Sequence, residues 1–125
     1  SLKILQCCVE NEIPYVLESP TSSFLWRTDN LLGFVNINGA IISSLDFCQY
    51  GMRWKKPTCL MHPRLPGLDS LLQCHGVQGV CSSTQRAHIK LHGRDPTGTF
   101  WTLRAQPYPL RLCNDIARIL SANLV

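Results

Sequence analysis

The segment "SLKILQCCVENEIPYVLESP", residues 1–20, decides the fold class. Its first ten residues carry apolar side chains at helical spacing, at Leu2, Leu5, Cys8 and Val9. Residues 13–17 then form a short apolar run that stops at Glu18, which predicts a buried strand over 13–18. A helix followed directly by a buried strand is typical of an α/β fold.

The rest of the chain extends this α/β pattern. Further strands are expected near residues 40–46 and 57–61, a short helix within 22–32, and a closing amphipathic helix over 109–124. Residues 62–100 hold five of the eight glycines and all four histidines, which predicts a loop-rich insert. We therefore expect residues 1–125 to form a single domain.

Composition narrows the protein class. Apolar residues make up 45% of the 125 and charged residues 16%, which excludes a disordered chain. No apolar run approaches the roughly 20 residues that span a bilayer, so no membrane association is expected. The net charge of +4 is compatible with a polyanionic partner without requiring one. Seven cysteines, an odd number, without a secretory signal favour reduced thiols in an intracellular protein.

Four side chains in the insert have the chemistry of zinc ligands. Cys74, Cys81, His88 and His92 follow the spacing C-x6-C-x6-H-x3-H. This spacing is wider than the usual zinc knuckle, and two interpretations stay open. One is a structural zinc site, and the other is a set of buried thiols and loop histidines.

Glu18 ends the first predicted strand in a carboxylate. In open α/β sheets ligands gather at the carboxyl ends of strands, where an acid can contact the ring edge of a heterocycle. The alternative is an acid that faces water or caps the following helix.

Two basic features could bind phosphates. Arg53, Lys55 and Lys56 follow a glycine turn, with Trp54 between them to stack on a base or pack on the core. Arg104 precedes the closing helix, where it could orient an acidic group or a phosphate. The alternatives are a solvated basic loop and a surface salt bridge.

Three stretches in order resemble the DNA (cytosine-5)-methyltransferase family, and most closely its divergent phage-like and mobile-element members. They are "YVLESP" (15–20), "FCQYGMRWKKPT" (47–58) and "LRAQPYPLRLCNDIA" (103–117). The resemblance implies a partial Rossmann-like methyltransferase sheet with a small loop-rich insert. Residues 60–98 would be its target-recognition segment.

The same resemblance implies roles for single residues. Glu18 would contact the ring edge of a flipped target cytosine, and Arg104 would structure that catalytic site. Arg53, Lys55 and Lys56 would contact DNA. Any metal in the insert would be structural.

The sequence departs from the family in ways that limit its expected activity. Ser19 stands where the family has Asn, and no Pro-Cys pair supplies a nucleophilic cysteine. The glycine loop for S-adenosylmethionine is also missing. We therefore expect this chain to be the C-terminal half of such an enzyme. It would use S-adenosylmethionine only together with the N-terminal half. It would associate either with that half or with another copy of itself. The alternative function is a non-catalytic, mobile-element-derived zinc or nucleic-acid interaction module.

Overall fold

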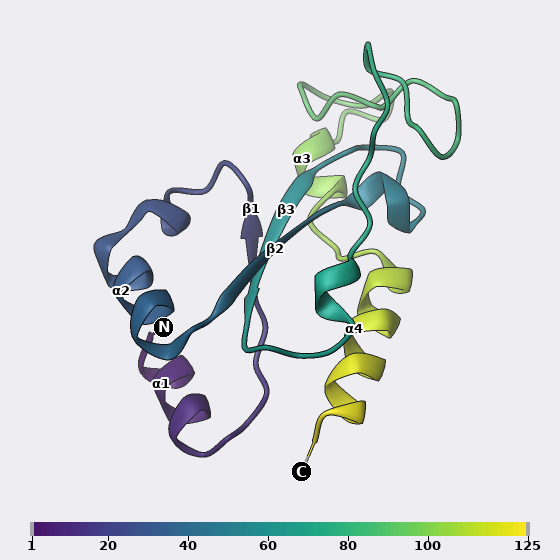
Figure 1. The fold of residues 1–125 in the computed structure, drawn as a ribbon. Coiled ribbons are helices and arrows are strands. Elements are labelled where there is room, and N and C mark those ends of the chain that lie inside the picture. The colour runs from purple at the N-terminus through teal and green to yellow at the C-terminus, as the bar shows by residue number, and fades with distance from the viewer. Residues whose placement is uncertain (1, 125) are drawn as a thin grey trace.

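A computed structural model describes residues 2–124 and has three layers (Figure 1). A small sheet forms the middle layer, with α1 and α2 on one side and α4 on the other. In chain order the helices and strands are α1 (Leu2–Glu10), β1 (Leu17–Pro20), α2 (Asp29–Asn38), β2 (Ile41–Asp46), β3 (Pro57–His62), α3 (Trp101–Arg104) and α4 (Leu110–Ala122). The chain is thus a mixed α/β fold, as its sequence predicts.

The sheet has the order β1-β3-β2, and both of its pairings are antiparallel. Strands β1 and β2 consequently run in the same direction, with α2 connecting them and β3 lying between them. The expected Rossmann-like sheet is not present in residues 2–124. The physical reason is the ten-residue connection 47–56 between β2 and β3, because a parallel neighbour needs a crossover of about a dozen residues or more.

Strand β1 begins later than its apolar run predicts. Leu17 pairs with Met61, so Tyr15, two positions earlier, would have to pair with Pro63. Proline has no N–H to donate to the ladder, and pairing therefore ends near Leu17. Glu18 lies inside the strand, opposite Leu60, rather than at its carboxyl end as the sequence predicts.

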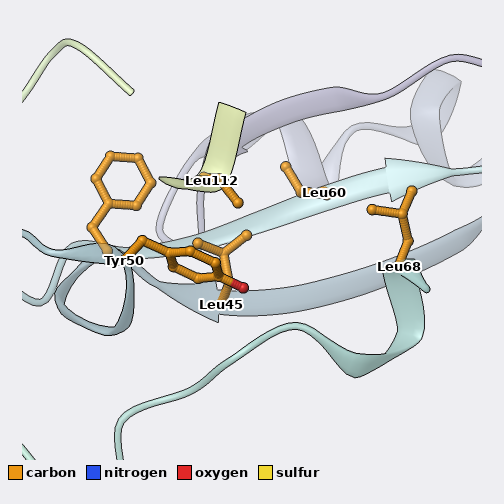
Figure 2. Packing of buried hydrophobic residues seen from close by; sticks show 6 residues of the cluster. Leu45, Tyr50, Leu60, Leu68 and Leu112 are labelled. Atoms are coloured by element: carbon orange, nitrogen blue, oxygen red, sulfur yellow. The ribbon is translucent and has the colours of Figure 1, made fainter. Parts of the chain in front are cut away.

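The two faces of the sheet build two separate cores. On one face Met61 and Leu17 pack with Leu5 of α1 and with Leu31 and Phe34 of α2. On the other face Leu45 and Leu60 pack with Leu112 of α4, together with Phe47, Tyr50 and Leu68 (Figure 2). This alternation is the period of two that a strand imposes on its side chains.

Local capping decides where the second helix lies. The sequence predicts a helix within 22–32, whereas the structure has a 3₁₀ helix, η1 (Phe24–Arg27), followed by α2. Ser23 caps η1, and the Thr28 hydroxyl accepts the Leu31 N–H at 3.4 Å to start α2. Gly39 ends α2 in the left-handed conformation with φ of 64°, which glycine adopts without strain.

Residues 62–100 are loop-rich, as expected. Beyond the end of β3 they contain one short 3₁₀ helix, η3 (Leu68–Ser70), and take part in two isolated bridges. Figure 1 shows this insert extending as loops beyond one end of the sheet, near α3. None of the described helices is long and apolar enough to cross a membrane.

Candidate metal centre

Four metal-ligating side chains converge where the insert meets the sheet. The sulfur atoms of Cys48, Cys74 and Cys81 and a ring nitrogen of His88 all lie within 4.8 Å of one another. Sulfur atoms around a tetrahedral zinc ion are about 3.8 Å apart, since each Zn–S bond is about 2.3 Å. The four atoms are therefore spaced closely enough for one ion to reach all of them after a small contraction.

Three of these residues, Cys74, Cys81 and His88, are the ones that the sequence predicts. The fourth position belongs to Cys48 in place of the expected His92, which is exposed and outside the cluster. Cys48 comes from the short helix η2 (Phe47–Tyr50), directly after β2. It is buried, and it joins the insert to the α/β layer.

A buried aspartate positions Cys74 against the end of β2. The Cys74 N–H donates to Oδ2 of Asp46 at 2.7 Å, and the Asp46 N–H donates to the Leu72 carbonyl at 3.1 Å. Asp46 is the last residue of β2 and is only 6% exposed. Since a buried carboxylate needs hydrogen-bond partners, this pair fixes the entry of the insert beside Cys48.

Cys81 and His88 are held together by a tight loop. An isolated bridge joins Val80 to Ala87, and the Cys81 N–H donates to the Arg86 carbonyl at 2.8 Å. The His88 N–H donates to the Gly79 carbonyl at 2.8 Å. These bonds keep a thiol and an imidazole side by side although six residues separate them in the sequence.

Hydrogen-bond donors surround the sulfur atoms. The backbone N–H groups of Gly76 and Ser82 and the Ser82 hydroxyl each approach Cys74 Sγ at 3.5 Å. The Gln49 amide donates to Cys48 Sγ at 3.4 Å and to Cys81 Sγ at 3.6 Å. Such outer contacts orient metal ligands and stabilise negative sulfur.

Burial and these contacts give the three thiols different pKa values. Burial raises the pKa of the Cys48 thiol to about 12. Burial also acts to raise the pKa of Cys74, but hydrogen bonds from Ser82 and its neighbours lower it to about 6. For Cys81 burial is likewise outweighed by hydrogen bonds, chiefly from the Thr84 backbone, which lower its pKa to about 7. A divalent cation would allow all three sulfurs to ionise together, because metal binding displaces thiol protons.

The donor set selects a soft or borderline metal. Three thiolates and one imidazole are typical of closed structural zinc sites, whereas magnesium and calcium take oxygen ligands. All three cysteines are buried and His88 is half-buried. The residues present therefore fit a zinc ion with no position left for a substrate.

The structure places Glu18 in a different region, beside the start of α4. The Tyr108 hydroxyl donates to Glu18 Oε2 at 2.6 Å, and this bond raises the pKa of Tyr108 to about 12. Lys56 donates to the Ala105 carbonyl at 2.7 Å. Burial lowers the pKa of Lys56, and the nearby Glu18 carboxylate partly opposes that shift.

Apart from Lys56, the predicted basic residues do not gather around Glu18. Arg104 forms an ion pair with Asp95, whose pKa hydrogen bonds from Thr97 lower to about 2. Arg53 is exposed and lines a separate cavity at the metal centre, while Lys55 is half-buried and joins neither group. Among residues 2–124 no hydrogen bond or ion pair links Glu18 to Arg53 or Arg104.

Of the two roles expected for Trp54, the structure shows packing on the core, whereas a role for Tyr108 is not predicted from the sequence. Trp54 packs on the core beside α4, and its buried Nε1 has no hydrogen-bond partner in the described chain. Tyr108 belongs to the third of the stretches that resemble the methyltransferase family, and it contacts Glu18 in the first. Its only sequence signal is its place between Pro107 and Pro109, which fixes the backbone just before α4.

Comparison with known proteins identifies no relative of this chain. No protein-family model, curated protein or solved structure matches it.

Proposed function

We propose that this chain is a zinc-stabilised binding module in which Cys48, Cys74, Cys81 and His88 hold one structural zinc ion. The observation that carries the proposal is the convergence of the four ligand atoms within 4.8 Å of one another. The ligands come from η2 and from two separate parts of the insert. The ion would therefore fasten the insert to the α/β layer.

The surroundings favour a structural role for the ion over a catalytic one. Four protein ligands complete a tetrahedral shell, whereas catalytic zinc keeps one position for water or substrate. The sulfurs of Cys48 and Cys74 also accept hydrogen bonds from Gln49, Gly76 and Ser82, which are outer contacts of the kind that hold metal ligands in place.

The insert has few other means of holding its conformation. Apart from η3 and the isolated bridges, residues 63–100 have no regular secondary structure among the described residues. Zinc binding contributes roughly 10–16 kcal/mol in zinc-finger peptides, far more than a few loop hydrogen bonds. Removal of the ion should loosen the insert, while the two hydrophobic cores beside the sheet persist.

Paired histidine variants test this proposal. His88→Ala should lose stoichiometric zinc, while His92→Ala should retain it, because His92 lies outside the cluster. Metal analysis after dialysis gives the stoichiometry, and cobalt substitution gives the geometry through its visible d–d bands and its thiolate charge-transfer band. Equal zinc content in both variants and the parent protein would contradict the ligand assignment.

A second candidate function is that of a cytosine-5-methyltransferase-like half that contacts a target base. It is favoured by the meeting of the three stretches that resemble that family, through Tyr108 with Glu18 and Lys56 with Ala105. A cavity of about 590 Å³ adjoins Glu18 and Tyr108 between β1 and α4. Glu18 Oε2 accepts from Tyr108, and no hydrogen bond within residues 2–124 engages Oε1.

This second function would show itself as recognition of an extruded cytosine. A mismatched cytosine leaves the stack at lower cost than a paired one. We expect tighter binding to a duplex with one mismatched cytosine than to the matched duplex, and Glu18→Gln should remove the difference. Equal affinity for both duplexes in the parent protein would argue against base contact by Glu18. S-adenosylmethionine would have to be bound by residues other than those described.

A further inference from the structure

A second cavity, of about 310 Å³, lies against the metal centre and is lined by three arginines. Arg53 comes from the β2–β3 connection, Arg86 from the insert and Arg111 from the first turn of α4. Cys81 and His88 line the same cavity. Three distant parts of the chain thus each contribute an arginine to the lining of one cavity.

No acidic residue lines this cavity. Within residues 2–124 the ion pairs join Arg104 to Asp95 and Arg118 to Asp115, and neither includes a cavity arginine. Three like charges repel one another unless an anion lies between them. The cavity therefore has the charge of an anion site whose counter-ion is not supplied by the described residues.

The start of α4 adds to this positive charge. Arg111 occupies the first turn, which has no acidic residue, and the preceding Pro109 makes no side-chain cap. A cation is unfavourable at a helix N-terminus, because the unpaired N–H groups already give that end a positive charge. The Arg111 side chain covers Gly51, where a Cβ atom would lie 3.7 Å from its Cζ. Gly51 and Arg111 both line the cavity, so this contact places the guanidinium at the cavity wall.

We propose that the cavity formed by Arg53, Arg86 and Arg111 binds a phosphate group. Guanidinium groups bind phosphate through paired, charge-assisted hydrogen bonds, which lysines cannot reproduce. The cavity volume lies at the lower end of the range of about 300–1,000 Å³ for ligand sites. The phosphate could be a free ion or part of a nucleic-acid backbone, since both present the same oxygens.

One part of this inference rests on the proposed zinc site. Cys81 and His88 are proposed ligands as well as cavity walls, so the ion would order the wall that carries Arg86. The charge and position of Arg53 and Arg111 do not depend on the ion. Failure of the zinc site and failure of the phosphate site can therefore be told apart by measuring metal content and phosphate binding on the same samples.

The test uses the full chain as purified, with its metal content recorded, and two probes. One probe is inorganic pyrophosphate measured by calorimetry, and the other is a fluorescent 12-base-pair DNA duplex measured by anisotropy at several salt concentrations. Arg111→Gln and Arg53→Gln should each weaken binding about tenfold, as expected for loss of a hydrogen bond to a charged group. Arg118→Gln on the same helix is the matched control and should change affinity less than about twofold.

The two probes separate the sources of the phosphate. Arginine-dependent binding of pyrophosphate alone supports a site for free phosphates. Arginine-dependent duplex binding, with a salt slope that falls by about 1 in Arg111→Gln, supports a site for the nucleic-acid backbone. Absence of binding to both probes, or equal losses in Arg118→Gln and Arg111→Gln, overturns the proposal. A zinc-free protein that still binds phosphate through Arg111 would contradict only the zinc site.

Discussion

The Cys74 sulfur lies 3.7 Å from Nε2 of His88, although the two residues are fourteen positions apart. Sulfur and nitrogen atoms that share a tetrahedral zinc ion are about 3.6 Å apart, given bonds of about 2.3 and 2.0–2.1 Å. The loop between them therefore already has the conformation that an ion would require. Cys48 and Cys81 complete the group from two other segments.

Replacement of Cys48 should have a much larger effect than replacement of Cys59. Both cysteines are buried, but Cys59 contacts Thr21 and Ser44 and lies outside the cluster. We expect Cys48→Ala to lose tightly bound zinc and at least about 3 kcal/mol of unfolding free energy, since loss of a metal is among the most destabilising changes. Metal analysis and urea unfolding measure both quantities.

Cys59→Ala serves as the matched control for this change. It removes the same atoms from a buried position, so it should keep its zinc and cost only about 1 kcal/mol. If Cys59→Ala lost zinc to the same extent as Cys48→Ala, the assignment of Cys48 as a ligand would be wrong.

Local features of the fold could be predicted from the sequence. The apolar spacing of residues 1–10 and 109–124 corresponds to α1 and α4, and the runs near 40–46 and 57–61 correspond to β2 and β3. Each of these depends on neighbours a few positions away, which sequence periodicity reports directly. Strand direction cannot be predicted in this way, because an apolar run has the same pattern in a parallel and an antiparallel sheet.

The fourth ligand could not be predicted for a related reason. Cys74, Cys81 and His88 lie within one loop, so their spacing is visible in the sequence. Cys48 lies before β3 and reaches them only because Asp46 ties the end of β2 to the Cys74 backbone. The sequence favours His92 because it follows His88 by four positions. It would share a face with His88 only in a helix, and the insert forms none there.

Gly76→Ala should disrupt the metal centre. A Cβ atom at Gly76 would lie 1.8 Å from the Val80 carbonyl oxygen, so the backbone on one side would have to move. That movement would displace the Gly76 N–H from Cys74 Sγ, which it now approaches at 3.5 Å. We expect zinc affinity to fall at least about tenfold, as for loss of an outer-shell contact, measured by competition with a chelating dye.

Gly33→Ala is the control for that substitution. Gly33 lies inside α2, and a Cβ atom there would meet no atom within 4 Å. Alanine should therefore stabilise the protein by about 0.5–1 kcal/mol through its higher helix propensity, without a change in zinc affinity. Unchanged zinc affinity in Gly76→Ala would mean that the close approach at Gly76 does not matter to the site.

The core beneath α4 depends on Leu112. Its side chain is 2% exposed and packs with Leu45 and Leu60 of the sheet (Figure 2). Leu112→Ala should cost about 2–5 kcal/mol of unfolding free energy in urea, from lost burial and the remaining cavity. Leu110→Ala, at a position that is 73% exposed, should change stability by less than about 0.5 kcal/mol. Similar losses in the two variants would contradict the packing of α4 on the sheet.

The Tyr108–Glu18 contact should be visible in a pH titration. The hydrogen bond to Glu18 raises the pKa of Tyr108 from its ordinary value of 10 to about 12. Because the folded-state pKa is the higher one, the stabilisation is present below pH 10 and is lost as the pH rises from about 10 to 12.

Tyrosine-selective NMR can follow this titration for Tyr108 alone. Glu18→Gln removes the carboxylate charge and should lower the pKa of Tyr108 toward the ordinary value. Tyr108→Phe should remove the assigned signal without affecting zinc content. A Tyr108 pKa near 10 in the parent protein would show that the contact with Glu18 does not persist in solution.

The zinc content of the purified chain tests the central claim most directly. After dialysis against metal-free buffer we expect one zinc ion per chain by mass spectrometry. A strong chelator should then loosen the insert, seen as faster amide exchange in residues 74–88. Substoichiometric zinc, together with amide exchange that the chelator leaves unchanged, would contradict the account.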